Sequence, residues 1–148
     1  MRITEKTWIE YITRLAKINE TAGQKMADYI ARHGTQDTDA LIAYAQALVQ
    51  KYGEGSAELA CQMYDAMAEA SGADVPPAVP AEPADYNETA KMVNATKQSP
   101  PQLQGGVSRL VKRAGADTTL KNAIRDGAEW AWVPYGDTCP FCITLASR

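Results

Sequence analysis

Two cysteines near the end of the chain are the residues whose spacing most directly suggests chemistry. Cys139 and Cys142 are separated by Pro140 and Phe141 within the run "WAWVPYGDTCPFCITLASR", residues 130–148. Two thiolates at this spacing can form a redox couple, or they can both face one metal ion. The two uses need different surroundings, so the remainder of the chain decides between them.

A thiol–disulfide protein is the first alternative. The Cys-Pro-aromatic-Cys sequence resembles the active-site loop of glutaredoxins, and a cysteine at a helix N-terminus has a lowered pKa because the exposed amides stabilise its thiolate. In thioredoxin-like folds, however, the strands and helices of the domain follow the motif, whereas only six residues follow Cys142. The sequence therefore disfavours a redox enzyme that uses Cys139 and Cys142, and no other set of residues indicates an enzyme.

A zinc site is the second alternative, and it needs four ligands. Cys139 and Cys142 supply two of them. The only histidine, His33, is predicted at the end of a helix, where a histidine more often caps carbonyl groups, and Cys61 is predicted on a buried helix face. The pair is thus predicted to be half of a metal site, which would bind zinc only with ligands from beyond Arg148.

A basic segment is the third candidate site. Residues 1–84 carry 7 Lys/Arg against 12 Asp/Glu, while residues 85–125 carry 7 against 3. Cations of this kind can contact phosphates, but no aromatic side chain lies among them and no DNA-reading motif is present. A solvated helix face is the favoured interpretation, and weak DNA contact stays as the alternative. The residues concerned are Arg109, Lys112, Arg113, Lys121 and Arg125.

Composition limits the class of protein. The 148 residues, of which 45% are hydrophobic and 22% charged, suit one globular domain or a domain with an appendage. Charges interrupt the N-terminal apolar residues, so no signal peptide is predicted. No window approaches the roughly 18 uncharged apolar residues of a membrane span. We expect a soluble intracellular protein in a reducing compartment, without membrane contact.

Hydrophobic periodicity predicts helices along most of the chain. Apolar positions recur every three or four residues from Thr4 to about His33, then from 37 to 52, and again from 56 to about 71. Glycines follow each of these stretches and are interpreted as helix ends: Gly34, Gly53 and Gly72. The short connections predict an antiparallel bundle of three helices.

Four prolines in "ADVPPAVPAEPA" predict an extended linker between this bundle and a second helical part. Asp85 and Glu88 indicate a capping box that opens a helix to about Lys97. The run "SPPQLQGG" is interpreted as an interruption, and "EWAWVP" as a strand. Further helices are predicted over 107–114, over 117–125 with its end at Gly127, and from about Pro140.

The fold class expected is therefore mainly α. It comprises an N-terminal antiparallel helical bundle, a proline-rich linker and a C-terminal helical segment with one short strand and a Cys-x-x-Cys knuckle. The corresponding divisions of the chain are 1–72, 73–84, 85–128 and 129–148.

The run from Val133 to Arg148 resembles a signature of MuF-like head morphogenesis proteins, the minor head proteins named after protein F of phage Mu. The shared features are Val-Pro, a Gly/Asp/Thr turn, Cys-x-x-Cys and Leu-Ala-Ser-Arg. In that family the segment opens the MuF domain, whose later part usually brings a His and a further Cys pair. The resemblance implies that residues 129–148 are the start of a truncated MuF-like domain.

The same resemblance implies a structural function. MuF-like proteins are present in few copies, associate with the portal or the inside of the capsid, and are not known as enzymes. We therefore expect a non-catalytic protein of the virion, or of the host cytoplasm during assembly, with capsid or portal proteins as partners. A strand bearing Trp130 and Trp132 also favours self-association, so a homo-oligomer is a further expectation.

Overall fold

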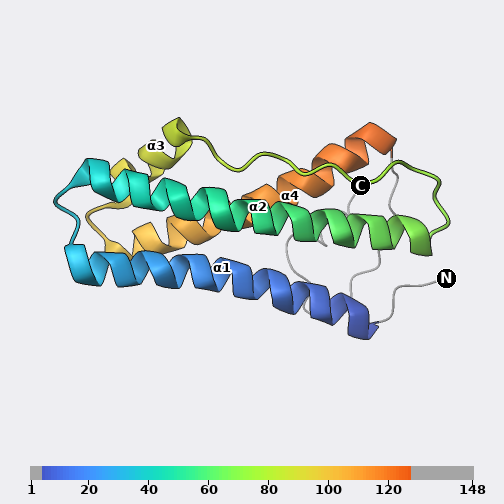
Figure 1. Ribbon diagram of the computed structural model, residues 1–148, viewed down its shortest axis with the longest axis horizontal. Coiled ribbons are helices and arrows are strands. Elements are labelled where there is room, and N and C mark those ends of the chain that lie inside the picture. The colour runs from blue at the N-terminus through green and yellow to red at the C-terminus, as the bar shows by residue number, and fades with distance from the viewer. Residues whose placement is uncertain (1–4, 128–148) are drawn as a thin grey trace.

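The computed structural model describes residues 5–127, which form four helices (Figure 1). These are α1 (Glu5–His33), α2 (Thr38–Ala70), α3 (Tyr86–Thr96) and α4 (Pro100–Asp126). The mainly α prediction is confirmed. Thr4, where the first helix was expected to start, the strand in "EWAWVP", the cysteine knuckle and the predicted segment 129–148 all lie outside the described residues.

Helices α1 and α2 form an antiparallel pair, as their short connection predicts, but the predicted bundle of three helices before the prolines is wrong, because residues 5–72 contain two. Gly34 follows α1 with φ of 74°, a left-handed conformation that glycine adopts without a steric penalty. Asp37 then caps α2, because its side chain accepts a hydrogen bond of 3.1 Å from the Ala40 amide. Farther along the pair, Trp8 of α1 packs against three side chains of α2: Leu59, Met63 and Met67.

The prediction that α2 ends at Gly53 is wrong, because one helix continues to Ala70. A Cβ added at Gly53 would lie 2.9 Å from the Cβ of Pro83. The glycine therefore allows the proline-rich segment, residues 73–85, to pass close to the helix. Packing on both sides of Gly53 outweighs its propensity penalty of about 1 kcal/mol.

Two further predicted breaks are also wrong, because α4 is continuous where two helices and an interruption were expected. Pro100 and Pro101 occupy its first positions, where a backbone N–H has no helical acceptor to lose. The helix ends as predicted at Gly127, whose φ is 58°. Between these ends, Gly115 brings α4 against α2: an added Cβ would lie 2.7 Å from Ser56 Oγ.

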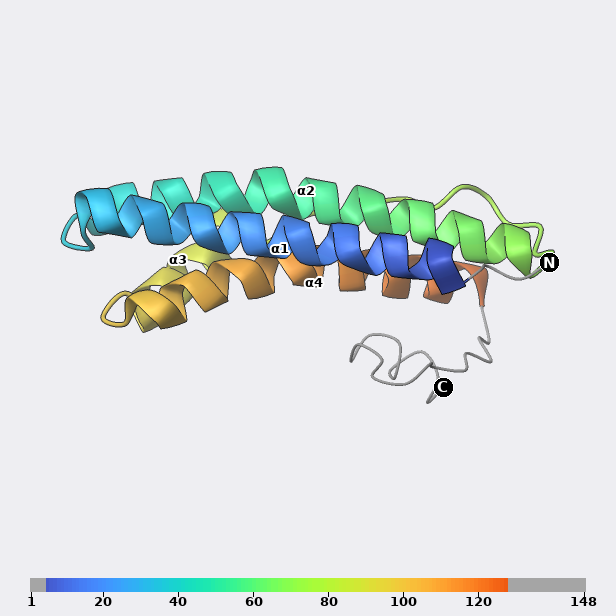
Figure 2. The same cartoon turned by 90° about the horizontal axis from the view of Figure 1, so that it is seen from below.

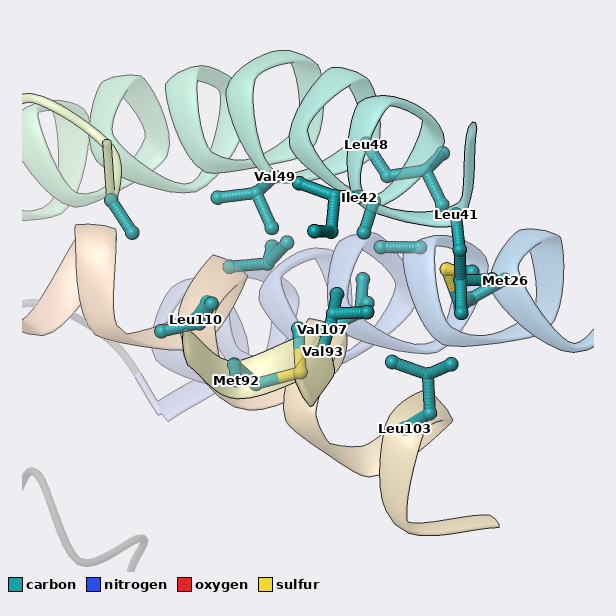
Figure 3. Close-up of a cluster of buried hydrophobic side chains, with 14 residues drawn as sticks. Met26, Leu41, Ile42, Leu48, Val49, Met92, Val93, Leu103, Val107 and Leu110 are labelled. Carbon is teal, nitrogen blue, oxygen red and sulfur yellow. The ribbon is translucent and has the colours of Figure 1, made fainter. Parts of the chain in front are cut away.

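Helices from both sides of the proline-rich segment share one hydrophobic core (Figure 3). Asp85 caps α3 as predicted, accepting a 2.9 Å hydrogen bond from the Glu88 amide, and α3 then contributes buried side chains to the core. The shared cluster includes Met26 of α1, Ile42 and Val49 of α2, Met92 and Val93 of α3, and Leu103, Val107 and Leu110 of α4.

The path of the chain sets the directions of the helices (Figures 1 and 2). The segment after α2 runs back along the bundle to α3, so α4 lies parallel to α2 and antiparallel to α1. Contacts at the two interfaces agree with these directions: Tyr64 of α2 meets Asn122 of α4, and Ser108 of α4 donates to the Asn19 carbonyl of α1. Within residues 5–127, no helix is long and apolar enough to cross a membrane.

Candidate functional site

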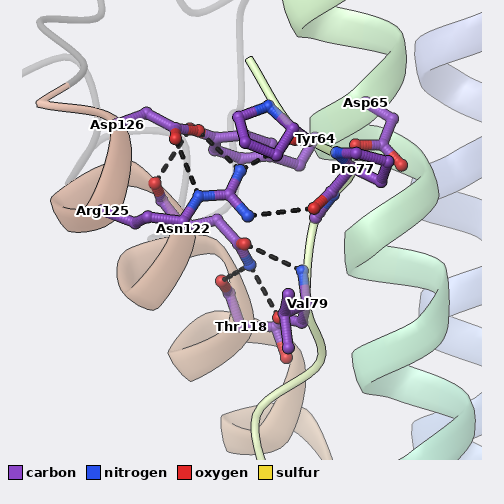
Figure 4. A network of polar contacts seen from close by, with 10 residues as sticks. Tyr64, Asp65, Pro77, Val79, Thr118, Asn122, Arg125 and Asp126 are labelled. Atoms are coloured by element: carbon purple, nitrogen blue, oxygen red, sulfur yellow. Dashed lines mark hydrogen bonds and ion pairs between the residues drawn. The ribbon is translucent and has the colours of Figure 1, made fainter.

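Asn122 of α4 is the centre of the most extensive polar network in the described residues (Figure 4). Its side chain is 1% exposed. The Nδ2 group donates to the carbonyls of Val79 (2.8 Å) and Thr118 (2.7 Å), while Oδ1 accepts from the Val79 amide at 2.8 Å. One buried amide thus satisfies both backbone groups of Val79, in the way that a neighbouring strand would.

Other side chains fix the rest of this proline-rich segment, defined as residues 73–85. The Ala81 amide donates to Thr118 Oγ1 at 2.9 Å, and the Ala78 amide donates to Asp65 Oδ1 at 2.8 Å. Proline has no N–H, so these non-proline residues supply the backbone donors. The segment is therefore held to both α2 and α4.

A charged group closes the network at the end of α4. Arg125 donates to the carbonyls of Pro76 and Pro77, each at 2.9 Å, and pairs with both oxygens of Asp126 at 2.7 and 2.8 Å. The hydroxyl of Tyr64 donates to Asp126 Oδ2 at 2.7 Å and lies 3.1 Å from the Asn122 carbonyl oxygen. Asp126 thereby joins a side chain of α2 to the arginine that holds the prolines.

The ionisation of this group follows from its contacts. The hydrogen bonds from Arg125 hold the pKa of Asp126 below its usual value, and the same bonds raise the pKa of Arg125. Burial, together with the Asp126 carboxylate, raises the pKa of the Tyr64 hydroxyl. At neutral pH the group is an ion pair with a protonated tyrosine, an arrangement that positions backbone rather than one that transfers protons.

A groove of about 980 Å³ lies between the outer face of α2 and the proline-rich segment. Four carboxylates line it, from Glu54, Glu58, Asp65 and Glu82, together with Asp85 at its end. Cys61 also borders this groove, and burial followed by the nearby carboxylates raises the pKa of its thiol. The Cys61 thiol is therefore protonated at neutral pH and is a poor nucleophile.

The five basic residues singled out in the sequence all lie on α4, but they do not share one role. Arg125 holds Pro76 and Pro77, and Lys121 Nζ lies 3.5 Å from the Pro80 carbonyl. Arg113 pairs with Glu88 of α3 and lies 3.7 Å from Asp117. This leaves exposed Arg109 and Lys112 as the two of the five without an ion pair or hydrogen bond to another described residue.

The cysteine pair predicted to hold a metal, Cys139 and Cys142, lies outside the described residues. His33 stands at the end of α1 with its ring centroid 4.7 Å from that of Tyr29. Among residues 5–127 no group of three or more His, Cys, Asp and Glu side chains could hold a metal ion. The zinc prediction stays untested.

Sequence reasoning missed Tyr64 and Asn122 as the residues that organise this network. Tyr64 belongs to the periodic stretch from 56 to about 71, where a tyrosine is read as one more core side chain, and it is 1% exposed. A signal was present in α4, where Thr118 and Asn122 continue the buried face of Val111 and Ala114 one and two turns later. Polar side chains on a buried helix face need buried partners, and here the partners are backbone groups of the proline-rich segment.

Fold and network together define a helical-bundle protein whose proline-rich segment is fixed between two of its helices. The model of the VG15 protein family matches residues 2–148, and the chain belongs to this family, a phage gene family. No curated protein and no solved structure matches the chain. The expected phage origin is supported at this level, whereas the MuF-like minor head assignment stays a prediction.

Proposed function

We propose that this phage protein is a structural, non-catalytic component of head morphogenesis that acts by binding capsid or portal proteins. The observation that carries the proposal is the resemblance of Val133–Arg148 to the segment that opens MuF domains. Membership of a phage family over residues 2–148 supports the viral setting. The site of action would be the assembling head in the host cytoplasm, and then the virion.

The described part of the chain supports a role in protein contacts. Its proline-rich segment is fixed by side chains from two helices, so the surface beside it is ordered before any partner binds. Tyr86 is 53% exposed on that surface and borders the acidic groove. Exposed tyrosine is enriched in protein interfaces, where its ring supplies a large contact area at low entropic cost.

The test is to follow the protein through assembly of the phage that encodes it. A stop codon in place of Lys6 removes the protein, and a synonymous change in the same codon controls for effects on neighbouring genes. We expect the chain in purified proheads by mass spectrometry, and few DNA-filled heads from the stop-codon phage until the gene is supplied in trans. Absence of the chain from proheads, with a normal yield of filled heads, would contradict the proposal.

DNA binding by α4 is less well supported as an alternative. Three of its five basic residues are engaged within the protein, which leaves Arg109 and Lys112 for phosphates. The redox alternative depends on Cys139 and Cys142, outside the described residues. Neither alternative has a specific structural observation in its favour.

A further inference from the structure

An apolar groove of about 150 Å³ lies between α1 and α4, with α2 beneath it. Ile12 and Ala16 of α1 line one side, Gly115 and Ala116 of α4 line the other, and Met63 of α2 borders it. This groove is separate from the acidic one, which lies between α2 and the proline-rich segment. Its lining is mostly apolar, so water inside it makes few hydrogen bonds.

Exposed apolar side chains extend this surface toward the end of α4. Ile9 is 53% exposed and precedes Ala16 by seven residues, two turns along the same face of α1. Leu120 and Ile124 are 46% and 64% exposed and follow Ala116 by four and eight residues. A single exposed apolar residue is ordinary, but helical spacing places these three on the faces of α1 and α4 that line an apolar groove, as expected of a surface that another segment covers.

We propose that residues 128–148 of the same chain bind this surface, with Trp130 and Trp132 covering Leu120 and Ile124 and reaching the groove. The segment has 21 residues, follows α4 directly and is rich in large apolar side chains. The helix axis between Gly127 and Thr119, which lines the groove, is about 12 Å long. Four to five extended residues span that distance, so the segment is long enough to reach the groove.

Covalent attachment favours this occupant over a second copy of the chain. A segment joined by a short connection has an effective concentration in the millimolar range, well above that of a second copy at micromolar protein. The two tryptophans also suit the surface chemically, because each buries a large apolar area. The proposed contact depends on neither the head-assembly role nor a metal at the cysteines.

Limited digestion with chymotrypsin tests the proposal on the full chain, because this protease cleaves after tryptophan and needs an exposed, extended substrate. Ala16→Lys places a cation beside the groove, where Lys112 already contributes one and cannot pair with it, and Leu120→Lys places a cation on its exposed extension. Ala47→Lys is the matched control, because Ala47 is exposed on α2 and does not border the groove. The rate of first cleavage after Trp130 or Trp132 is followed by mass spectrometry, and thermal unfolding confirms that each variant is folded.

We expect both groove variants to be cleaved roughly tenfold faster than the wild type, because an unpaired charge in an apolar contact favours the released segment. The control should be cleaved at the wild-type rate. Equal cleavage of Leu120→Lys and the control would overturn the proposal. So would protection in the wild type that disappears on hundredfold dilution, because that result assigns the surface to a second copy.

Discussion

Tyr64 connects α2 to the end of α4 through one hydroxyl group, and the two side chains that meet there are largely shielded from water. The Asp126 side chain is 5% exposed, and the tyrosine is 1% exposed. A charged acceptor in such a position needs several donors, which Arg125 and Tyr64 provide together. Loss of one donor therefore leaves a buried carboxylate with incomplete hydrogen bonding.

Tyr64→Phe removes this donor and leaves the ring in place. We expect the free energy of unfolding to fall by about 1–3 kcal/mol, because a hydrogen bond between the buried Tyr64 and the largely shielded Asp126 side chain is lost. Denaturation in urea at pH 7 measures the change. Tyr86→Phe is the control, since Tyr86 is 53% exposed and its substitution should have little effect.

The same variant also tests how the free energy of unfolding depends on pH. The pKa of Tyr64 is raised above the ordinary value of 10.0, so above that pH the unfolded chain releases a proton that the folded protein keeps. The stability that depends on this group is full below pH 10 and decreases as the pH rises further. Tyr64→Phe should accordingly lose less stability above pH 10 than the wild type does. An identical alkaline loss in the two proteins would show that Tyr64 titrates normally.

Glycines inside the helices are the element-scale feature that most affects packing. Gly115 faces Ser56 of α2, where an added Cβ would lie 2.7 Å from Oγ and 3.2 Å from the backbone oxygen. Gly105 belongs to the same helix, but an added Cβ there would meet nothing within 4 Å. One glycine is required by a close approach of two helices, and the other is not.

Substitution of these two glycines by alanine should have opposite effects. Gly115→Ala is expected to cost about 1–3 kcal/mol, because the α2 backbone must move to admit the methyl group. Gly105→Ala should stabilise the protein by up to about 1 kcal/mol through helix propensity. Thermal unfolding of both variants beside the wild type measures the pair. A destabilised Gly105→Ala with an unaffected Gly115→Ala would reverse the assignment of the helix contact.

These glycines also explain which elements the sequence could predict. The start of α3 at Asp85 and the helix ends at Gly34, Gly72 and Gly127 follow local rules, and the structure confirms them. The sequence predicts helix breaks at Gly53 and at Gly105–Gly106, because a glycine inside a helix is unfavourable on its own. What keeps these helices continuous is packing against partners distant in the sequence, and hydrophobic periodicity does not reveal those partners.

The network around Asn122 was beyond prediction for a related reason. An asparagine in a helix gives no indication that a segment some forty residues earlier needs its amide. For the basic residues the charge was evident from the sequence. The sequence did not show, however, that the carbonyls of Pro76 and Pro77 accept hydrogen bonds from Arg125. Residue type indicated the available chemistry, whereas the fold determined its use.

The whole molecule is organised around a core shared by helices from both sides of the proline-rich segment. Met26 and Ile42 belong to the same buried cluster as Met92 and Val107, although the sequence predicted separate divisions at 1–72 and 85–128. Neither set of helices buries its apolar face without the other. We therefore expect the described part of the chain to unfold in one cooperative step.

Asn122→Ala tests this expectation, because it releases the proline-rich segment from α4. Hydrogen exchange at increasing urea, read on peptides from α1 and from α3, should give one midpoint in the wild type. In the variant, the urea midpoints of both peptides should fall together, by an amount that corresponds to about 2–4 kcal/mol. The reason is that three hydrogen bonds are lost and the backbone groups of Val79 are left without their partners. Gln36→Ala, in an exposed turn, is the control. Earlier exchange in α3 alone would indicate two independent units.

The prolines of the segment also act on the state from which the protein folds. Pro76, Pro77, Pro80 and Pro83 each fix φ whether or not the chain is folded, so the unfolded segment already samples few conformations. Less conformational entropy is then lost when Asn122 and Arg125 fix it in place. The segment can be ordered by a few side-chain hydrogen bonds, without a strand partner, because much of its restriction is covalent.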